Sequence, residues 1–321
     1  MLRIGFISAW HVHAGGYADH IKNSGKAWVT VVWDCDAERG KSFAAKKGAA
    51  WEPDYDQFLA REDVDAVVCC APTTMHEELL TKAAKAGKHI FTEKLLTPDA
   101  AGAKRLAEAV SDAGVTFVIS FPEKGAGRVQ YIKQLLTDGK LGTVTAARFR
   151  RSHSGVSGGW LPPYWFELKD SGGGSLMDLG AHPVYILSDF FGAPTRITAL
   201  MSNIYGTSSD ENAIVLAEFA NGVLGTMETG FVTDCVSDEL EVYGTKGYVA
   251  MGGQNRLWTR LAGEEERDIP REEWPTAKPS PLAQFIDAAI AGEKSVPGLD
   301  LEKAVLLTEI TEAAYAADKK V

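Results

Sequence analysis

The chain has 321 residues, 45% of them hydrophobic, and its 43 acidic residues outnumber its 33 basic ones to give a formal charge of −10. This length is enough for two domains with buried cores. The acidic excess argues against nucleic acid as a partner, because binding phosphates needs a basic surface. We recognise neither a secretory leader nor a run of about 18 apolar residues, so we expect a soluble, cytoplasmic protein that does not span a membrane.

The cysteines show no disulfide framework. Cys69 and Cys70 are adjacent in an apolar segment where successive side chains point to opposite faces, and Cys35 and Cys235 lie far from them. Reduced thiols of this kind are typical of a reducing compartment.

Short apolar segments alternate with helical patterns over the first 121 residues. The expected strands are 2–7, 29–33, 64–70, 89–91 and 115–120. The expected helices between them are 37–47, 74–86 and 98–113. Such alternation predicts a parallel sheet with helices on both faces. We therefore predict a doubly wound, Rossmann-like domain over residues 1–121.

The pattern changes after an expected helix at 129–138. Long strands with alternating side chains are expected at 143–151, 196–204, 213–219, 223–229, 238–243 and 248–251. Asn221-Gly222 is a typical hairpin turn, and helices are expected at 282–291 and 300–316. We predict an α+β domain over residues 122–321, built on a large, open, mostly antiparallel sheet.

Ligands of parallel sheets bind beyond the carboxyl ends of the strands. Asp34 directly follows the second expected strand, where a carboxylate accepts hydrogen bonds from the adenosine ribose and repels a 2′-phosphate. This position favours NAD over NADP. Asp34 could instead be a solvated loop residue or part of a helix cap, although Asp36 is better placed to cap.

The loop after the first strand lacks the expected G-x-G-x-x-G pattern. The three glycine positions fall on Ser8, Trp10 and His13, while Gly15 and Gly16 follow shortly after. Because the second glycine normally lets the backbone approach the pyrophosphate, the chain must change its path here or bind that group differently.

His11 and His13 form an H-x-H motif at the end of a strand, which is also how some metal-dependent amidohydrolases begin their metal site. The sequence shows no further histidines at later strand ends of the kind that such a hydrolase needs. We therefore expect no metal here and keep a metal-dependent hydrolase as a minor alternative.

Two further motifs follow expected strands. Pro72 ends the strand before it, and His76 falls in the first turn of the next helix, where it could also be an ordinary surface residue. Glu93 and Lys94 end the segment that starts at His89 and point to opposite faces of the strand. A lysine at this edge of the sheet can reach a ligand, although solvated loop lysines are common.

The segment Gly172-Gly-Gly-Ser-Leu-Met-Asp178-Leu-Gly-Ala-His182 is the most informative. We expect Asp178 and His182 at positions i and i+4 of one helical face, where the pair could hold a substrate hydroxyl and take its proton. The alternative is an intrahelical pair that contributes only a few tenths of a kcal/mol.

Taken in order, these motifs resemble those of the glucose-fructose oxidoreductase and inositol dehydrogenase family, often written Gfo/Idh/MocA. The similarity extends over nearly the whole chain, including the later E-V-Y-G-T-K-G turn. It implies an N-terminal Rossmann domain, a C-terminal domain whose open sheet forms oligomer contacts, and hydride transfer between NAD and a secondary alcohol carbon of a sugar, polyol or cyclitol.

The resemblance also implies roles for single residues. Lys94 matches the catalytic lysine of an E-K-P motif, Asp178 the acid that orients the substrate, and His182 the histidine that transfers the proton. The implied cofactor contacts come from the ends of several strands. They are Ser8, Trp10, His11, His13, Asp34, Pro72, His76, Glu93 and Lys94.

The chain departs from the family pattern at three places besides the glycine loop. Leu95 replaces the proline of E-K-P, which removes a φ constraint and a special peptide geometry, Phe121-Pro-Glu-Lys124 replaces a Y-N-R-R-like stretch, and Trp165-Phe166 replaces W-R. A non-catalytic nucleotide-binding sensor of the same fold is therefore the main alternative. The joint retention of Lys94, Asp178 and His182 favours an enzyme, which we expect to be a homodimer or homotetramer.

Overall fold

The computed structural model describes residues 1–234 and 238–318, so Cys235 lies outside the described residues. The chain forms two compact units, Met1–Ser120 with Pro279–Thr308, and Phe121–Lys278 with Glu309–Val321. The sequence assigned 122–321 to one domain, whereas residues 279–308 belong to the first unit. The reason is packing, because α9 (Pro281–Ala291) contacts β1, β5 and β6 of the first unit.

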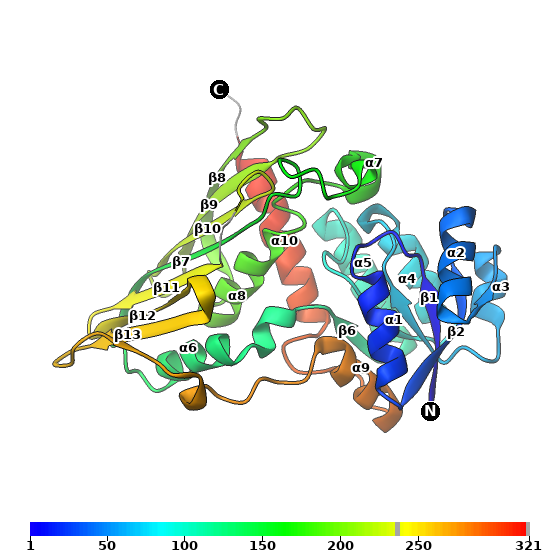
Figure 1. Cartoon of the computed structure of the whole chain (residues 1–321), viewed down its shortest axis with the longest axis horizontal. Helices are drawn as coiled ribbons and strands as arrows, with labels where there is room; N and C mark the ends of the chain where they lie inside the picture. Colours follow the sequence, from blue (N-terminus) through cyan, green and yellow to red (C-terminus); the bar gives the residue numbers. More distant parts are fainter. Residues whose placement is uncertain (235–237, 319–321) are drawn as a thin grey trace. The chain divides into compact units, whose positions relative to one another are not determined.

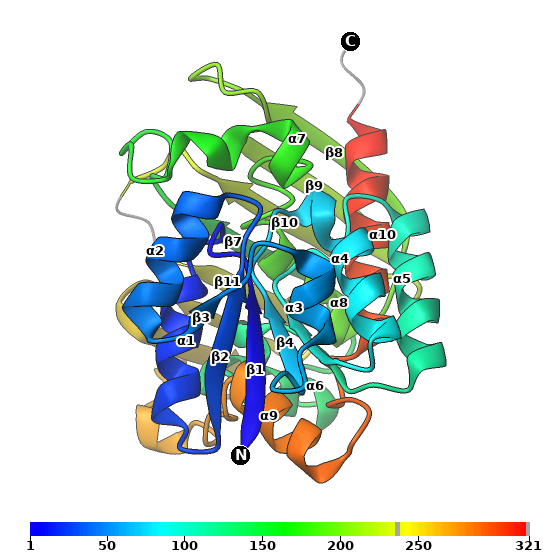
Figure 2. The same ribbon diagram turned by 90° about the vertical axis from the view of Figure 1, so that its right-hand side faces the viewer.

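The first unit contains a six-stranded sheet in which every neighbouring pair is parallel. Its strands, in spatial order, are β3 (Ala50–Trp51), β2 (Ala27–Trp33), β1 (Leu2–Ile7), β4 (Ala66–Cys69), β5 (His89–Thr92) and β6 (Phe117–Ile119). Figure 2 shows β3, β2, β1 and β4 side by side. This is the order 3-2-1-4-5-6 of dinucleotide-binding folds, which confirms the predicted fold class.

Helices connect these strands. They are α1 (Ala14–Asn23), α2 (Ala37–Lys47), α3 (Tyr55–Ala60), α4 (His76–Lys85) after the 3₁₀ turn η1 (Thr73–Met75), and α5 (Ala100–Ala113). Asp36 caps α2 as predicted, since its side chain accepts a hydrogen bond from the Arg39 N–H, and α2 ends at Gly48 with a left-handed φ of 70°. The short helices α1 and α3 were not predicted.

The second unit contains an eight-stranded sheet, confirmed as mostly antiparallel. The spatial order is β14 (Arg267–Asp268), β13 (Arg256–Leu261), β12 (Gly247–Gly252), β11 (Glu239–Gly244), β7 (Val144–Ser152), β10 (Leu224–Gly230), β9 (Asn212–Phe219) and β8 (Pro194–Ser202). β7 and β10 pair in parallel and the other neighbours are antiparallel.

One face of this sheet carries helices, as Figure 1 shows. α8 (Ala181–Phe191) contacts β7 and β10, and α6 (Gly127–Thr137) contacts β12. Along β9 the side chains alternate, so that Val215 is buried and Leu216 is 49% exposed. The remaining short elements are η2 (Pro122–Gly125), η3 (Pro163–Phe166), α7 (Leu168–Ser171), η4 (Gly253–Asn255) and η5 (Arg271–Glu273). The long helix α10 (Leu301–Ala317) is shared by the two units.

Among the described residues, no helix is both long enough and apolar enough to cross a lipid bilayer.

Candidate functional site

The expected cofactor residues of the first unit follow the carboxyl ends of β1, β2, β4 and β5. The strand order reverses between β1 and β4, and ligands of such sheets bind beyond the carboxyl ends at this point.

Asp34 is buried and its carboxylate is fully engaged. Oδ2 accepts hydrogen bonds from the Ala9 N–H at 2.8 Å and from Arg39 Nε at 3.0 Å. Oδ1 accepts from the Asp36 N–H at 3.0 Å and from Arg39 Nη2 at 2.6 Å. Asp34 follows β2, as expected, but the sequence missed Arg39, whose side chain is 23% exposed and whose guanidinium neutralises the acid.

The loop after β1 satisfies its own backbone. The Trp10 N–H donates to Ser8 Oγ, the His11 N–H to the Cys70 carbonyl, and the His13 N–H to His11 Nδ1. Ser8 takes a left-handed φ of 62°, and Trp10 is buried where the second glycine was expected. These three amides therefore do not provide the phosphate cradle of a glycine-rich loop.

The first turn of α1 offers an alternative. Gly15 and Gly16 lie there, and a Cβ added to either would meet no atom within 4 Å. First-turn amides of a helix have no intrahelical partner and favour anions. These residues therefore fit the pyrophosphate of a dinucleotide.

His76 is buried, contrary to its reading as a surface residue. Its Nε2 lies 3.0 Å from the Ala71 carbonyl, and its Nδ1 lies 2.9 Å from the Leu95 carbonyl and 3.2 Å from the Leu96 carbonyl. Burial lowers the pKa of this imidazole despite these acceptors. His76 thus joins the loops after β4 and β5.

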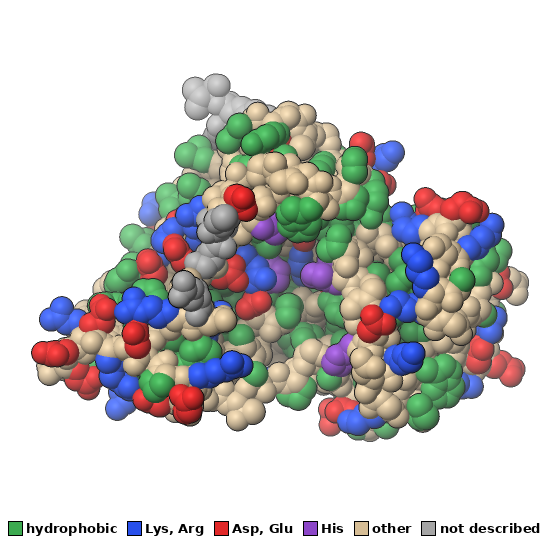
Figure 3. All heavy atoms as spheres, viewed as in Figure 1, with side chains coloured by type: hydrophobic (Ala, Val, Ile, Leu, Met, Phe, Trp, Pro, Cys, Tyr) green, Lys and Arg blue, Asp and Glu red, His purple; other side chains and the backbone are tan. Residues whose placement is uncertain are grey.

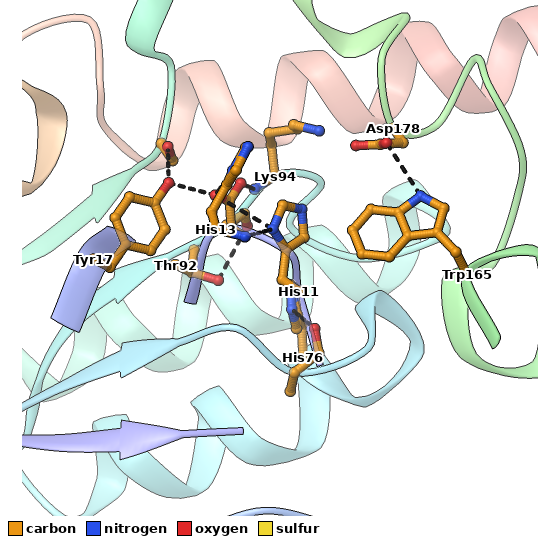
Figure 4. Close-up of polar contacts among 11 residues, drawn as sticks. His11, His13, Tyr17, His76, Thr92, Lys94, Trp165 and Asp178 are labelled. Carbon is orange, nitrogen blue, oxygen red and sulfur yellow. Dashed lines mark hydrogen bonds and ion pairs between the residues drawn. The ribbon is translucent and has the colours of Figure 1, made fainter. Parts of the chain in front are cut away.

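Glu93 is the centre of a polar cluster at the end of β5, and Figure 4 shows its partners His13 and Tyr17. Oε1 lies 2.8 Å from His13 Nδ1 and accepts a hydrogen bond from the Tyr17 hydroxyl, while Oε2 accepts from the Lys94 N–H at 3.2 Å. His11 Nδ1 lies 3.9 Å from Oε1. The sequence found the two histidines but missed Tyr17.

The side chains that set the ionisation of Glu93 all lie in the first unit. Burial by itself raises the pKa of the Glu93 carboxyl, but the neighbouring His11, His13 and Lys94 side chains hold it well below its usual value. Burial, and then the negative charge of Glu93, raise the pKa of Tyr17, so its hydroxyl remains a donor.

The same cluster has the composition of a metal site. His11, His13 and Glu93 each offer a ligand atom, and the three atoms lie within 4.8 Å of one another. The atoms are already used in hydrogen bonds, because His11 Nδ1 accepts from the His13 N–H, and Oε1 of Glu93 has two donors. Their arrangement suits a hydrogen-bonded network that holds the first loop.

Lys94 is 5% exposed and directly follows β5 and Glu93. The peptide between Lys94 and Leu95 is cis. The expectation that loss of the proline removes a special peptide geometry is therefore wrong.

Asp178 lies in the second unit, in turns that precede α8, which begins at Ala181. The prediction that Asp178 and His182 share one helical face is wrong, because three glycines and the turns after them delay the start of the helix. Asp178 Oδ2 accepts a hydrogen bond from Trp165 Nε1 at 3.3 Å (Figure 4). The Trp165-Phe166 departure thus includes a residue that orients the acid.

His182 is the second residue of α8 and is 4% exposed. Its Nδ1 lies 2.7 Å from the hydroxyl of Tyr185, three residues further along the helix. This partner was missed, although its i+3 spacing is a signal that the sequence contains.

Asp210 holds the glycine segment that leads to Asp178. Its Oδ1 accepts from the Gly174 N–H at 3.0 Å and the Tyr315 hydroxyl at 2.7 Å, and its Oδ2 accepts from Ser175 Oγ at 2.9 Å and the Leu176 N–H at 2.8 Å. No sequence pattern singled out Asp210.

A parallel sheet of this strand order defines a dinucleotide-binding fold. Residues 4–121 match the family model for the oxidoreductase family with NAD-binding Rossmann fold, and residues 129–250 match the GFO/IDH/MocA C-terminal domain. The chain belongs to the Gfo/Idh/MocA family. The predicted family, the oxidoreductase class and the NAD-type cofactor are confirmed.

Two relatives and one solved structure illustrate the range of similar proteins. A 2,7-anhydro-N-acetylneuraminate hydratase from Escherichia coli K12 is 25% identical, over 83% of this chain and 73% of that protein. An inositol 2-dehydrogenase from Rhizobium meliloti is 24% identical, over 100% of this chain and 98% of that protein. A levoglucosan dehydrogenase, in complex with NADH and levoglucosan, has a TM-score of 0.86 at 19% identity and covers 98% of this chain and 96% of its own.

Proposed function

We propose that this protein transfers a hydride between NAD and a secondary alcohol carbon of a small sugar, polyol or cyclitol. The observation that carries the proposal is the buried Lys94 at the carboxyl edge of a 3-2-1-4-5-6 sheet. The inositol 2-dehydrogenase and the levoglucosan dehydrogenase support the substrate class by their names.

We propose that different residues would hold the two polar groups of the cofactor. The first turn of α1, where Gly15 and Gly16 leave open space, would hold the pyrophosphate. Asp34 would face the ribose, and Arg39 would weaken the repulsion that this acid exerts on a 2′-phosphate. Ser8, Trp10, His11 and His13 then shape the first loop, while Pro72, His76 and Glu93 hold the neighbouring ones.

The chain's own residues supply the proton chemistry. NAD, when bound, would supply the acceptor for the hydride of the alcohol carbon. His182 takes the hydroxyl proton at Nε2, and a positioned base of this kind contributes typically 10²- to 10⁴-fold. Lys94 stabilises the developing alkoxide by its charge, and Asp178, oriented by Trp165, accepts a hydrogen bond from the substrate.

Absorbance of the reduced nicotinamide across a panel of polyols, sugars and cyclitols tests the proposal. We expect turnover with at least one member. His182→Ala and Lys94→Ala should each lower this turnover roughly 100-fold or more and leave NAD binding nearly unchanged. Near-normal turnover of His182→Ala would show that the proposed chemistry is wrong.

The sensor alternative rests on the first loop, where Trp10 is buried and the amides are internally bonded. It predicts NAD binding with no turnover on any member of the panel.

We propose that the cluster of His11, His13 and Glu93 holds no metal. The hydrogen bonds among these residues support this, since the Glu93 oxygens and His11 Nδ1 already have donors.

We propose that two copies of the chain associate through the second sheet. On β8, β9 and β10, apolar side chains project from one face with large exposed fractions. These are Leu200 (74%), Ile214 (48%), Leu216 (49%) and Leu224 (56%). Leu200 pairs with Ile214 across the strands, so the apolar surface is continuous. We expect sedimentation to show a dimer or tetramer for the wild type and dissociation in the double variant Leu200→Lys, Leu216→Lys. A monomeric wild type contradicts the proposal.

We also propose a cytoplasmic location and a small-molecule substrate. The thiols of Cys35, Cys69 and Cys70 are free, which suits a reducing compartment. Acidic and basic side chains are interspersed on the face seen in Figure 3, which does not favour binding to nucleic acid.

A further inference from the structure

His182 has a close partner inside the second unit. Its Nδ1 lies 2.7 Å from the hydroxyl of Tyr185, and the two side chains are 4% and 1% exposed. Residues three apart on a helix lie on the same face, so α8 presents the phenol to the ring. A buried contact of this length fixes the plane of the imidazole.

Tyr185 is itself held from two sides. The ring of Phe121 stacks on it with 4.5 Å between centroids and an interplanar angle of 25°. The Glu123 N–H donates to the phenol oxygen at 3.2 Å. The Glu123 carboxylate is in turn paired with Arg151 at 2.8 Å, and Arg151 also pairs with Asp238 at 3.1 Å. The phenol therefore has little freedom to leave His182.

The hydrogen bond from Glu123 limits what the phenol can do. A phenol has one hydrogen and two acceptor sites, and the N–H, which can only donate, takes one of these sites. The remaining acceptor site or the hydrogen faces His182 Nδ1. Tyr185 can thus accept from a ring that carries a proton on Nδ1 or donate to one that does not.

We propose that Tyr185 is a positioning residue that orients His182 and fixes the tautomer in which Nε2 is free to exchange a proton with the substrate. This inference rests on the proposed function. In alcohol oxidation, the neutral ring carries its proton on Nδ1, where it is hydrogen-bonded to the Tyr185 oxygen, and Nε2 takes the hydroxyl proton to give an imidazolium. In carbonyl reduction, the imidazolium returns the Nε2 proton to the forming alkoxide and keeps the Nδ1–H that donates to Tyr185.

The variant Tyr185→Phe removes the oxygen and keeps the ring that packs on Phe121. We expect turnover in alcohol oxidation to fall about tenfold, which is less than the roughly 10²- to 10⁴-fold that a positioned base contributes because the base itself remains, while NAD affinity stays unchanged. The acidic limb of the pH profile should move to lower pH, because the charged ring loses its acceptor inside a buried site.

Phe121→Leu is the matched control, since it weakens the packing and keeps the oxygen. Its pH profile should match the wild type, whatever its loss of stability. If Tyr185→Phe keeps wild-type turnover and profile, or if Phe121→Leu moves the acidic limb as far, the inference is wrong. NMR titration of the histidines, with His182 assigned through His182→Asn, gives an independent readout, and an unmoved His182 midpoint in Tyr185→Phe also overturns it.

The two proposals fail separately. Retained turnover in His182→Ala contradicts the proposed function. An inactive His182→Ala beside an unaffected Tyr185→Phe contradicts only the role of Tyr185.

Discussion

Asp210 should be among the most sensitive polar residues of the second unit. Asp210→Ala removes four hydrogen bonds, two from the Gly174 and Leu176 amides and two from the Ser175 and Tyr315 hydroxyls. Hydrogen bonds to a charged group contribute about 1.5–3 kcal/mol each. Water reaches this half-buried site and replaces part of that stabilisation, so we expect a loss of about 3–4 kcal/mol.

Two milder variants set the scale. Burial, and then the charge of Asp210, raise the pKa of Tyr315, so this phenol donates at all ordinary pH values. Tyr315→Phe removes one donor to Asp210 and one acceptor of the Gly174 N–H, but that N–H keeps its bond to Asp210, so the loss should be about 1–1.5 kcal/mol. Asp287→Ala is a control for removing an acid, because Asp287 and its partner Lys26 are both more than half exposed, and such a pair contributes about 0–1 kcal/mol.

Urea and thermal unfolding measure these losses. A change of 1 kcal/mol shifts Tm by about 2–4 °C in a unit of 150–250 residues, so Asp210→Ala should lower the Tm of the second unit by about 6–16 °C. Gly174→Ala should be at least as damaging, since its Cβ would lie 2.1 Å from the Asp210 carbonyl. A loss below about 1 kcal/mol in Asp210→Ala, or one no larger than in Tyr315→Phe, would refute this reasoning.

Three further predictions concern the first unit. Arg39→Ala leaves the charge of Asp34 unneutralised, so the preference for NAD over NADP should rise roughly tenfold or more. Titration of both cofactors at one salt concentration measures it, and an unchanged ratio counts against the role of Arg39. Gly15→Val should weaken NAD binding about tenfold, because the added side chain would crowd the pyrophosphate. Tm should not fall, since the side chain meets open space in the protein. Unaltered NAD affinity in the same titration would mean that the pyrophosphate binds elsewhere. Metal analysis after dialysis should find no stoichiometric zinc or manganese, and a bound metal that is lost in both His13→Ala and Glu93→Gln would contradict this.

Local sequence patterns were sufficient to identify the layers of the fold. The alternation of strands and helices predicted the parallel sheet, and α2 begins and ends at the predicted residues. Asp34, Lys94 and His182 were proposed as site residues because each belongs to a short motif at the end of a strand or the start of a helix. Such signals depend on residues that are neighbours in the chain.

The partners of these residues depend on tertiary structure. His13 and Glu93 are 80 residues apart, and Asp210 and Tyr315 are 105 apart, so no local pattern connects them. Residues 279–308 belong to the first unit because α9 packs on its sheet.

The sequence by itself determined the family, the parallel and the mostly antiparallel sheet, and the residue types that carry the proposed chemistry, because these follow from local periodicity and short motifs. Only the tertiary structure decided that Asp34 is neutralised by Arg39, that α8 starts after Asp178 and that Tyr185 holds His182. Hydrogen bonds and ion pairs of this kind depend on distances of about 3 Å between side chains, and packing sets those distances after the chain has folded.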